Sequence, residues 1–364
     1  MLTLCALASS MGRRIPYVLG GNATLIVMVG ALYVARRLMM GHAYLFLLLI
    51  AILALNTAYT GFTGLVSDMV GPEQMGLCSG LMGGMTAAGA VTGLVGLGFL
   101  VRTQDAYLLY SLALALSTPC TLWAAREPTD KQAASEKRPF DWGEVARAYY
   151  ITPASHGDFF WVFVSRTFYY MAVSVQIYIL YYLRDIIGIH HAKAYTSILC
   201  ILSQASSGLV SLSASPIADR TGRKPAIYLA VTIMALVYVG YCFVDTFEWV
   251  VFLGIAYGAG NGVYIAVDYA LAVDCLPSQD DDGAKDLALW GVSAFLGTMF
   301  GPCLAGPLLA WLGHIPGSDH YAFQGYVALM GCGVLYCIGC GCSLIFVRRG
   351  GEPVVGKESR EFRV

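Results

Sequence analysis

The sequence predicts an all-α integral membrane protein with many spans, from its composition and the length of its apolar runs. Of the 364 residues, 57% are hydrophobic and only 12% are charged, and the mean hydropathy is +0.65. Soluble domains carry about 25% charged residues. Lipid cannot satisfy open backbone polar groups, so long apolar runs without strand-like alternation predict helices. This composition excludes an ordinary soluble enzyme, a nucleic-acid-binding protein and a disordered chain.

The apolar runs divide the chain into about ten candidate spans, since a helix crosses the bilayer core in ~20 residues. They cover 15–34, 43–66, 76–101, 106–125, 159–183, 194–218, 225–244, 249–273, 287–312 and 322–347. The polar stretch 126–158 predicts a cytoplasmic linker, and 348–364 predicts a cytoplasmic tail. The predicted domains are therefore a four-span half at 1–125, the linker, a six-span half at 159–347, and the tail.

Positive charge predicts the orientation of these spans. When the segment before the first span is placed in the cytoplasm, most of the 22 Lys and Arg residues fall on the cytoplasmic side, as the positive-inside rule requires. Arg36 and Arg37, in an opposite loop, run against the rule. We therefore expect both termini in the cytoplasm, with the chain in the plasma membrane or an organelle membrane.

The two halves repeat the same features at a nearly constant offset. The matched pairs are Gly12-Arg13-Arg14 with Gly222-Arg223-Lys224, Asn56-x-x-Tyr59 with Asn261-x-x-Tyr264, and Asp68 with Asp274. Parallel duplications of this kind occur in transporters built from two six-helix halves. Two spans precede the Gly-Arg-Lys loop of the second half, so we expect the first half to lack two helices, with residues 1–10 as a remnant of the second. The alternative is a natural ten-helix protein with unequal halves.

The loop Asp219–Lys224 resembles the cytoplasmic loop motif of the major facilitator superfamily, with Ser215 where that family usually has Gly. The stretch 67–74 and the Gly-rich span after it match the family too, and 161–185 and 268–277 are similar to its sugar–cation and sucrose–proton symporter branches. The resemblance implies two helical halves that work by alternating access, with a cytoplasmic gate that biases inward against outward states. The expected gate residues are Asp219, Arg220, Gly222, Arg223, Lys224, Asp68 and Asp274. The alternative is that the loop serves only as a positive-inside anchor.

Two ionisable residues lie within predicted spans, where a charge costs ~2.5–3.5 kcal/mol on insertion scales and indicates function. Arg166 lies in the span 159–183 and Asp268 in the span 249–273. Both are roughly 9–12 Å from the cytoplasmic end, at about 1.5 Å per residue. Equal depth allows an ion pair, which would offset the burial of each charge. We expect the pair to act in gating or coupling; the alternative is a structural pair that fixes helix packing.

Polar and aromatic residues form stripes on three predicted helices. The stripes consist of Asn261, Tyr264 and Asp268; of Asn56, Tyr59, Thr60 and Thr63; and of Arg166, Tyr169 and Tyr170 with Gln176 at the edge. Residues at these spacings share a helix face. Amides and phenols near the midplane can hydrogen-bond a hydroxyl-rich solute while aromatic faces cover its apolar side. The alternative is hydrogen bonding between helices, worth ~0.6 kcal/mol on average.

Small residues recur at every fourth position in two spans. The series are Gly76, Gly80, Gly84 and Ala88 in the third span, and Gly297, Gly301 and Ala305 in the ninth. Small residues at this spacing let helices approach closely. We therefore expect these two spans to pack tightly against neighbours.

These observations predict a secondary active transporter of a small polar solute coupled to protons. A sugar is one candidate for the solute. The alternative is a non-transporting membrane protein: an inactive paralogue, a partner subunit or a truncated gene product. The expected partners are the lipid bilayer, the solute and protons, with a helix-supplying partner if the first half is incomplete. The net charge of −1 gives no reason to expect nucleic acid.

The sequence gives no sign of catalysis. It has no phosphate-binding Gly loop and no nucleophile elbow, and we expect no enzymatic activity and no cofactor. The Cys residues of the last span, Cys332, Cys337, Cys340 and Cys342, lie in an apolar run without a His beside them. They are predicted to act as small hydrophobic residues, and no metal site is expected.

Overall fold

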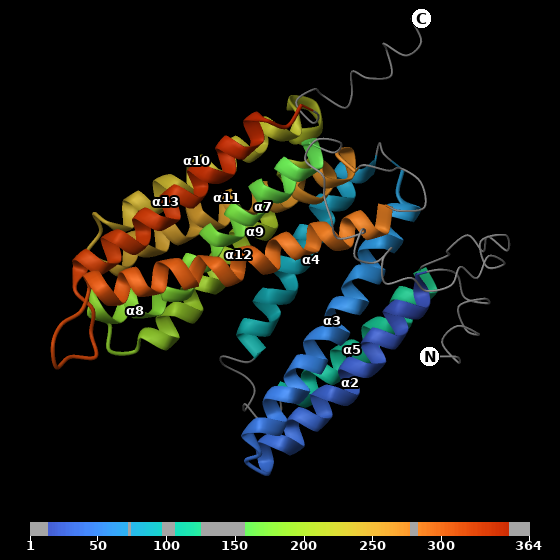
Figure 1. Ribbon diagram of the computed structural model, residues 1–364, viewed down its shortest axis with the longest axis horizontal. Coiled ribbons are helices and arrows are strands. Elements are labelled where there is room, and N and C mark those ends of the chain that lie inside the picture. Colours follow the sequence, from blue (N-terminus) through green and yellow to red (C-terminus); the bar gives the residue numbers. More distant parts are fainter. Residues whose placement is uncertain (1–13, 72–73, 97–105, 125–156, 277–282, 349–364) are drawn as a thin grey trace, which may run out of the picture. The chain divides into compact units, whose positions relative to one another are not determined.

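The computed structural model describes residues 14–71, 74–96, 106–124, 157–276 and 283–348 (Figure 1). Every regular element in these ranges is a helix, and the β-bridge between His314 and Tyr321 is isolated. The predicted linker lies outside the described residues except for 157 and 158, which begin a helix. Residues 1–10 and most of the predicted tail also lie outside them.

The helices form two compact units, each described by itself. The first unit contains α2 (Ile15–Arg37), α3 (Gly41–Met69) and α5 (Ala106–Ala124). The second contains α4 (Met75–Val95), α7 (Gly157–Ser174), η3 (Val175–Tyr178), α8 (Ile179–Asp185), α9 (Ala192–Thr221), α10 (Arg223–Tyr241), α11 (Phe247–Asp274), α13 (Phe323–Ile345) and, from Leu289 onwards, α12 (Gly283–Leu312).

The predicted membrane class is confirmed, because nine helices in the described ranges are long and apolar enough to span a bilayer. The other predicted span, 159–183, consists of three segments rather than one helix. There α7 passes into a single 3₁₀ turn, η3, and then into the short helix α8. The apolar run has neither Pro nor Gly at this point, so nothing in its composition marks the break.

Packing divides the chain differently from the sequence repeat. Helix α4 belongs to the first half by sequence, yet it packs with the C-terminal helices, most extensively with α9 and then with α11. The predicted halves are therefore defined by the sequence repeat alone. The two packing units are defined by which helices share a core, and the two divisions differ at α4.

The first unit is held by close packing of α2 on α3. Its core contains Leu25, Val29 and Leu32 of α2 with Ala51 and Ala54 of α3. Hydrogen bonds add α5 to this pair: the Asn22 amide donates to the Thr118 hydroxyl at 3.0 Å, and the hydroxyls of Tyr44 and Tyr107 are 3.1 Å apart.

The second unit is held by small residues that let helices touch. A Cβ at Gly80 of α4 would lie 2.7 Å from the Cβ of Ser215 in α9, closer than real Cβ contacts come. On α11, a Cβ at Gly262 would meet the backbone of Ser207 in α9, and on α12 a Cβ at Gly297 would lie 2.5 Å from the Thr167 carbonyl of α7. The close approach expected of the glycine series is therefore present in both helices.

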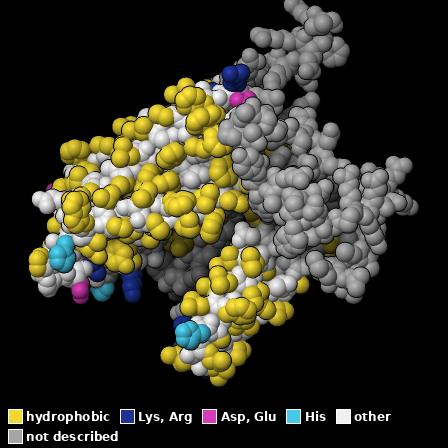
Figure 2. All heavy atoms as spheres, in the orientation of Figure 1, with side chains coloured by type: hydrophobic (Ala, Val, Ile, Leu, Met, Phe, Trp, Pro, Cys, Tyr) yellow, Lys and Arg dark blue, Asp and Glu magenta, His cyan; other side chains and the backbone are white. Residues whose placement is uncertain are grey.

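The exterior of the second unit is apolar. Figure 2 shows hydrophobic side chains over the visible face of its helices, with charged side chains at the helix ends. Phe252, Phe295 and Leu335 are among the large apolar side chains that are more than half exposed. A soluble monomer rarely exposes so much contiguous apolar surface, so these faces suit contact with lipid.

Candidate functional site

The centre of the second unit contains a buried ion pair between α7 and α11. Arg166 Nε donates to Asp268 Oδ2 at 2.9 Å. Arg166 is 3% exposed and Asp268 is 7% exposed. The structure thus brings together the two charges that the sequence predicts as a pair. Each charge offsets the desolvation of the other, and a lone charge at this depth would be costly.

Helix α12 completes the surroundings of Arg166. Nη1 of Arg166 donates to the Trp290 carbonyl at 2.7 Å and to the Ser293 hydroxyl at 3.1 Å. The guanidinium carbon lies 3.4 Å from the centroid of the Trp290 ring and 4.9 Å from that of Tyr170. The guanidinium is therefore held by a carboxylate, a carbonyl, a hydroxyl and two aromatic faces, so that α7, α11 and α12 meet at one charge.

Sequence reasoning missed Trp290 and Ser293. Neither is charged, and neither belongs to a stripe or a repeated motif. The sequence indicates them only indirectly, through the predicted burial of Arg166. A guanidinium has five N–H donors, and one carboxylate cannot accept hydrogen bonds from all of them. The remaining donors imply further hydrogen-bond acceptors, but the sequence does not show which helix supplies them.

An aromatic stack lies beside the ion pair. The rings of Tyr169 and Tyr264 are parallel, with centroids 3.4 Å apart and an interplanar angle of 4°. The Tyr169 hydroxyl donates to Asn261 Oδ1, and Asn261 Nδ2 donates to the Ser207 hydroxyl at 2.9 Å. The predicted stripe on α11 thus contacts α7 and α9. In this conformation the amide of Asn261 bonds other helices.

The remaining predicted solute-binding residues lie elsewhere. Gln176 is half-buried in η3, further along the span that carries Arg166. Asn56 and Tyr59 are exposed on α3, in the first unit, where Asn56 Nδ2 donates to the Ile52 carbonyl of its own helix at 2.8 Å. Gln176 is not among the hydrogen-bond partners of Arg166, and Asn56 and Tyr59 belong to a different unit from Arg166.

The predicted gate loop turns sharply between α9 and α10. Gly222 has φ 98°, a conformation that favours glycine. Directly after it, the buried side chain of Arg223 joins three helices. It forms an ion pair with Asp274 of α11, donates to the Ala270 carbonyl at 2.6 Å, and lies 3.6 Å from Asp219 Oδ1 of α9.

Other members of the predicted gate have different surroundings. Lys224 Nζ donates to the Val347 carbonyl at 2.5 Å, just after the end of α13, where a cation suits the helix dipole. Arg220 is exposed. Asp68 belongs to α3, and its side chain lies outside the described residues.

Ser215, the departure from the family loop pattern, has a clear place in the structure. Its hydroxyl donates to the Gly76 carbonyl of α4. A side chain at Gly76 would collide with the carboxylate of Asp219. The larger residue on α9 is thus accommodated by glycines on α4, and it links the two helices.

No group of three or more His, Cys, Asp or Glu in the described ranges is arranged to hold a metal ion. The last-span cysteines are free, with Cys332, Cys337 and Cys340 buried and Cys342 exposed. Their buried positions among apolar side chains are those of small hydrophobic residues.

The described helices are those of a multi-pass membrane protein. The Major Facilitator Superfamily matches the sequence over residues 1–279 and 162–363, and the chain belongs to this family. Its members are transporters rather than enzymes. A comparison with curated proteins gives no match.

Solved structures share the fold at low sequence identity. The human organic anion transporter MFSD10 (TETRAN) has TM-score 0.65 and 14% identity, over 93% of this chain and 79% of that one. The Escherichia coli fucose:proton symporter FucP has TM-score 0.66 and 12% identity, over 94% and 86%. A bacterial homologue of the iron transporter ferroportin has TM-score 0.65 and 14% identity, over 94% and 87%. At these identities the likeness shows the fold alone.

Proposed function

We propose that the protein is a secondary active transporter that moves a small polar solute, a sugar in the first instance, together with protons. The observation that carries this proposal is the buried ion pair between Arg166 and Asp268, which connects α7, α11 and α12. Charged side chains inside a membrane are costly and usually have a function. If the two residues served only to hold helices together, neutral hydrogen-bonding side chains could do so without that cost.

Protonation of Asp268 supplies a means of coupling. A proton on the carboxylate removes the negative charge that faces Arg166, while the Trp290 carbonyl and Ser293 hydroxyl still accept from the guanidinium. The attraction between α7 and α11 then weakens, and the attraction between α7 and α12 stays. A proton can thus shift the balance between two helix arrangements, as coupled transport requires.

The gate residues give the second element of the cycle. Arg223 connects α9, α10 and α11 at one end of the bundle. Asp274, the ion-pair partner of Arg223, lies on α11, the helix that also carries Asp268. In the proposed cycle a shift of α11 after protonation of Asp268 strains the Arg223 contacts. This linkage connects the proton site to opening of the cytoplasmic end.

The solute class is supported by the residues around the pair. Tyr169, Tyr264 and Asn261 supply two phenol rings and an amide. In this conformation the two rings are buried and stacked on each other, and the amide bonds Tyr169 and Ser207. Such groups suit a hydroxyl-rich solute. The structurally similar proteins carry names that refer to fucose, organic anions and iron, so the fold itself does not choose among solute classes.

Uptake by the purified chain in liposomes tests the proposal. A panel of radiolabelled hexoses and pentoses is applied with an inwardly directed proton gradient, and a trapped pH dye reports proton entry. The original chain should accumulate one sugar and acidify the lumen. Asp268→Asn should abolish both while it inserts and elutes as the original does, and Asp245→Asn, at an exposed loop position, should transport normally.

Two results would count against the proposal. Normal proton-driven accumulation by Asp268→Asn would remove the coupling role of the pair. A stable, monodisperse protein that neither accumulates nor exchanges any solute of the panel would favour a non-transporting membrane protein.

A further inference from the structure

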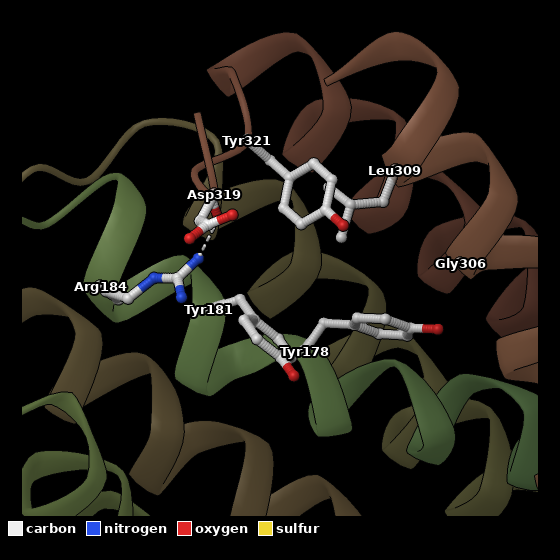
Figure 3. Close-up of a pocket in the computed structure, with 7 residues that line it drawn as sticks. All are labelled: Tyr178, Tyr181, Arg184, Gly306, Leu309, Asp319 and Tyr321. Atoms are coloured by element: carbon white, nitrogen blue, oxygen red, sulfur yellow. Dashed lines mark hydrogen bonds between the residues drawn. The ribbon is translucent and has the colours of Figure 1, made fainter. Parts of the chain in front are cut away.

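A polar hollow lies far from Arg166, at the other end of the same span. It is half-open, has a volume of about 240 Å³, and is lined by Tyr178, Tyr181, Arg184, Gly306, Leu309, Asp319 and Tyr321 (Figure 3). Tyr178 follows Arg166 by about 18 Å along the helix axis, at about 1.5 Å per residue. The hollow is therefore a separate place in the molecule from the buried ion pair.

The break in the span after α7 positions one wall. Tyr178 ends η3 and Tyr181 lies in α8, one helical turn further on, so both rings point to the same side. Gly306 of α12 leaves room for the first ring, since a Cβ there would lie 2.6 Å from Tyr178 Oη. The 3₁₀ turn and this glycine together open the space that the two rings border.

The loop between α12 and α13 forms the opposite wall, and Asp185 holds it. The Asp185 side chain is 0% exposed and accepts hydrogen bonds from Arg184, His320, Tyr326 and the backbone N–H of Tyr321, at 2.6 to 3.0 Å. Burial acts to raise the pKa of Asp185, but these hydrogen bonds outweigh it and lower the pKa. The carboxylate is thus charged at neutral pH and keeps the loop in place.

The rim of the hollow carries charges of both signs. Nη2 of Arg184 donates to the Asp319 carbonyl at 2.7 Å, and Asp319 is among the residues that line the hollow. Among the lining residues, Arg184 and Asp319 carry one charge each, of opposite sign, so an anionic ligand would be repelled by Asp319. A cationic ligand would compete with Arg184, whose guanidinium carbon lies 5.4 Å from the Tyr181 ring centroid. The balance favours a neutral ligand with both donors and acceptors.

The volume of the hollow and the aromatic residues that line it restrict the class of ligand further. The volume lies below the ~300–1,000 Å³ typical of drug-sized ligands, so the hollow takes one ring rather than a chain of rings. Figure 3 shows the side chains of Tyr178, Tyr181 and Tyr321 around it, with Arg184 and Asp319 at one end. Phenol rings cover the apolar face of a ring, while hydroxyl, guanidinium and carboxylate groups bind its hydroxyls.

We propose that this hollow is an outer subsite for a neutral, hydroxyl-rich ring of monosaccharide size. Helix α9 begins just after α8, and its 30 residues end within the gate loop, at Thr221, which places the hollow and the gate roughly 40–45 Å apart along it. The subsite is therefore at the end opposite the gate, where a solute arrives first. The choice of a sugar rests on the proposed function; the location of the site does not.

Equilibrium binding to the detergent-purified chain tests this subsite. The probes are radiolabelled D-glucose, L-fucose and D-xylose, with tetraethylammonium and benzoate as charged competitors. Gly306→Leu fills the hollow and should weaken sugar binding by about tenfold or more. Gly331→Ala, at a position with nothing within 4 Å of the added Cβ, should keep the affinity within about twofold. Asp319→Asn, a milder change, should also weaken binding.

Asp268→Asn separates this proposal from the proposed function. It should lose proton-driven uptake, and the further change Gly306→Leu should weaken its remaining sugar binding by the same factor as in the original chain. Loss of binding in Asp268→Asn with full binding in Gly306→Leu and Asp319→Asn would place the sugar at the ion pair and overturn the subsite. Failure of every sugar to bind the original chain would also overturn it, and so would displacement by tetraethylammonium or benzoate. Uptake of another solute would then still support transport.

Discussion

At the scale of single residues, one buried guanidinium connects three helices of the second unit. Arg166 has an ion-pair partner on α11 and acceptors on α12. A buried pair gives little net stability compared with an apolar replacement, but removal of one partner leaves an uncompensated charge. This asymmetry makes the pair suited to a switch, because small changes in the charge of Asp268 have large effects on its neighbour.

Replacement of Asp268 tests this view independently of transport. Asp268→Asn keeps an acceptor oxygen but removes the charge, and we expect it to destabilise the protein by about 1.5–3 kcal/mol, the value of a hydrogen bond to a charged group. The additional change Arg166→Gln should recover part of this loss, because no buried charge remains. Unfolding in mixed micelles measures both effects.

The matched control is Asp245→Asn, which lies in the exposed loop before α11 and should leave the unfolding midpoint unchanged. Additive losses in the double variant would show that the two side chains do not interact.

At the scale of elements, the contact of α4 with α9 combines glycines on one helix with serines on the other. Ser215 bonds the Gly76 carbonyl, and the Ser211 hydroxyl lies 3.3 Å from the Gly80 carbonyl. Such contacts are possible only at short interhelical distance. Helix α9 also ends in the loop that carries Arg223 and contacts α11, so α4 packs directly on the helix that leads into the predicted gate loop.

Two alanine substitutions on α4 test this contact. Gly80→Ala places a Cβ 2.7 Å from the Ser215 Cβ and 3.0 Å from the Ser211 carbonyl, whereas Gly89→Ala meets nothing within 4 Å. Both substitutions gain the same helix propensity. We expect Gly80→Ala to lose about 1–3 kcal/mol through overpacking and Gly89→Ala to lose nothing, as measured by thermal unfolding in detergent. Equal midpoints for the two variants would show that α4 does not pack closely on α9.

At the scale of the whole molecule, charge and hydropathy together describe a protein that fits a bilayer. On the face drawn in Figure 2, apolar side chains cover the described helices, and the charged side chains that can be seen lie at helix ends. We propose that the loop carrying Arg223 faces the cytoplasm, as the distribution of Lys and Arg predicts. The outer subsite then faces the opposite compartment.

Cysteine labelling at the two ends of α9 tests this orientation. Lys193 and Arg220 are both exposed and lie in the first and last turns of that helix. In a background without Cys5 and without Cys120, Cys303 and Cys342, the cysteines that are exposed in the described ranges, an impermeant maleimide applied to intact cells should label Lys193→Cys at once. It should label Arg220→Cys only after permeabilisation. The reverse pattern would invert the proposed topology and place the subsite in the cytoplasm.

The sequence by itself determined the class of protein and the main charged residues. Hydropathy predicted the helices because lipid leaves a spanning chain no other way to satisfy its backbone. Arg166 and Asp268 were identified because charge is rare inside a membrane, and the glycine series because its spacing places small residues on one face. These inferences depend on local chemistry or on helix period, which a single sequence displays.

Only the tertiary structure decided which faces meet. Helix period shows that Asn261, Tyr264 and Asp268 share a face, but it does not show that Tyr169 and Ser207 bond Asn261, or that Trp290 covers Arg166. The 3₁₀ turn and the loop held by Asp185 were likewise invisible, because both depend on contacts distant in sequence. The physical reason is that an apolar helix face can pack against lipid or against any other helix. Which of these it contacts is decided only when all the helices pack together.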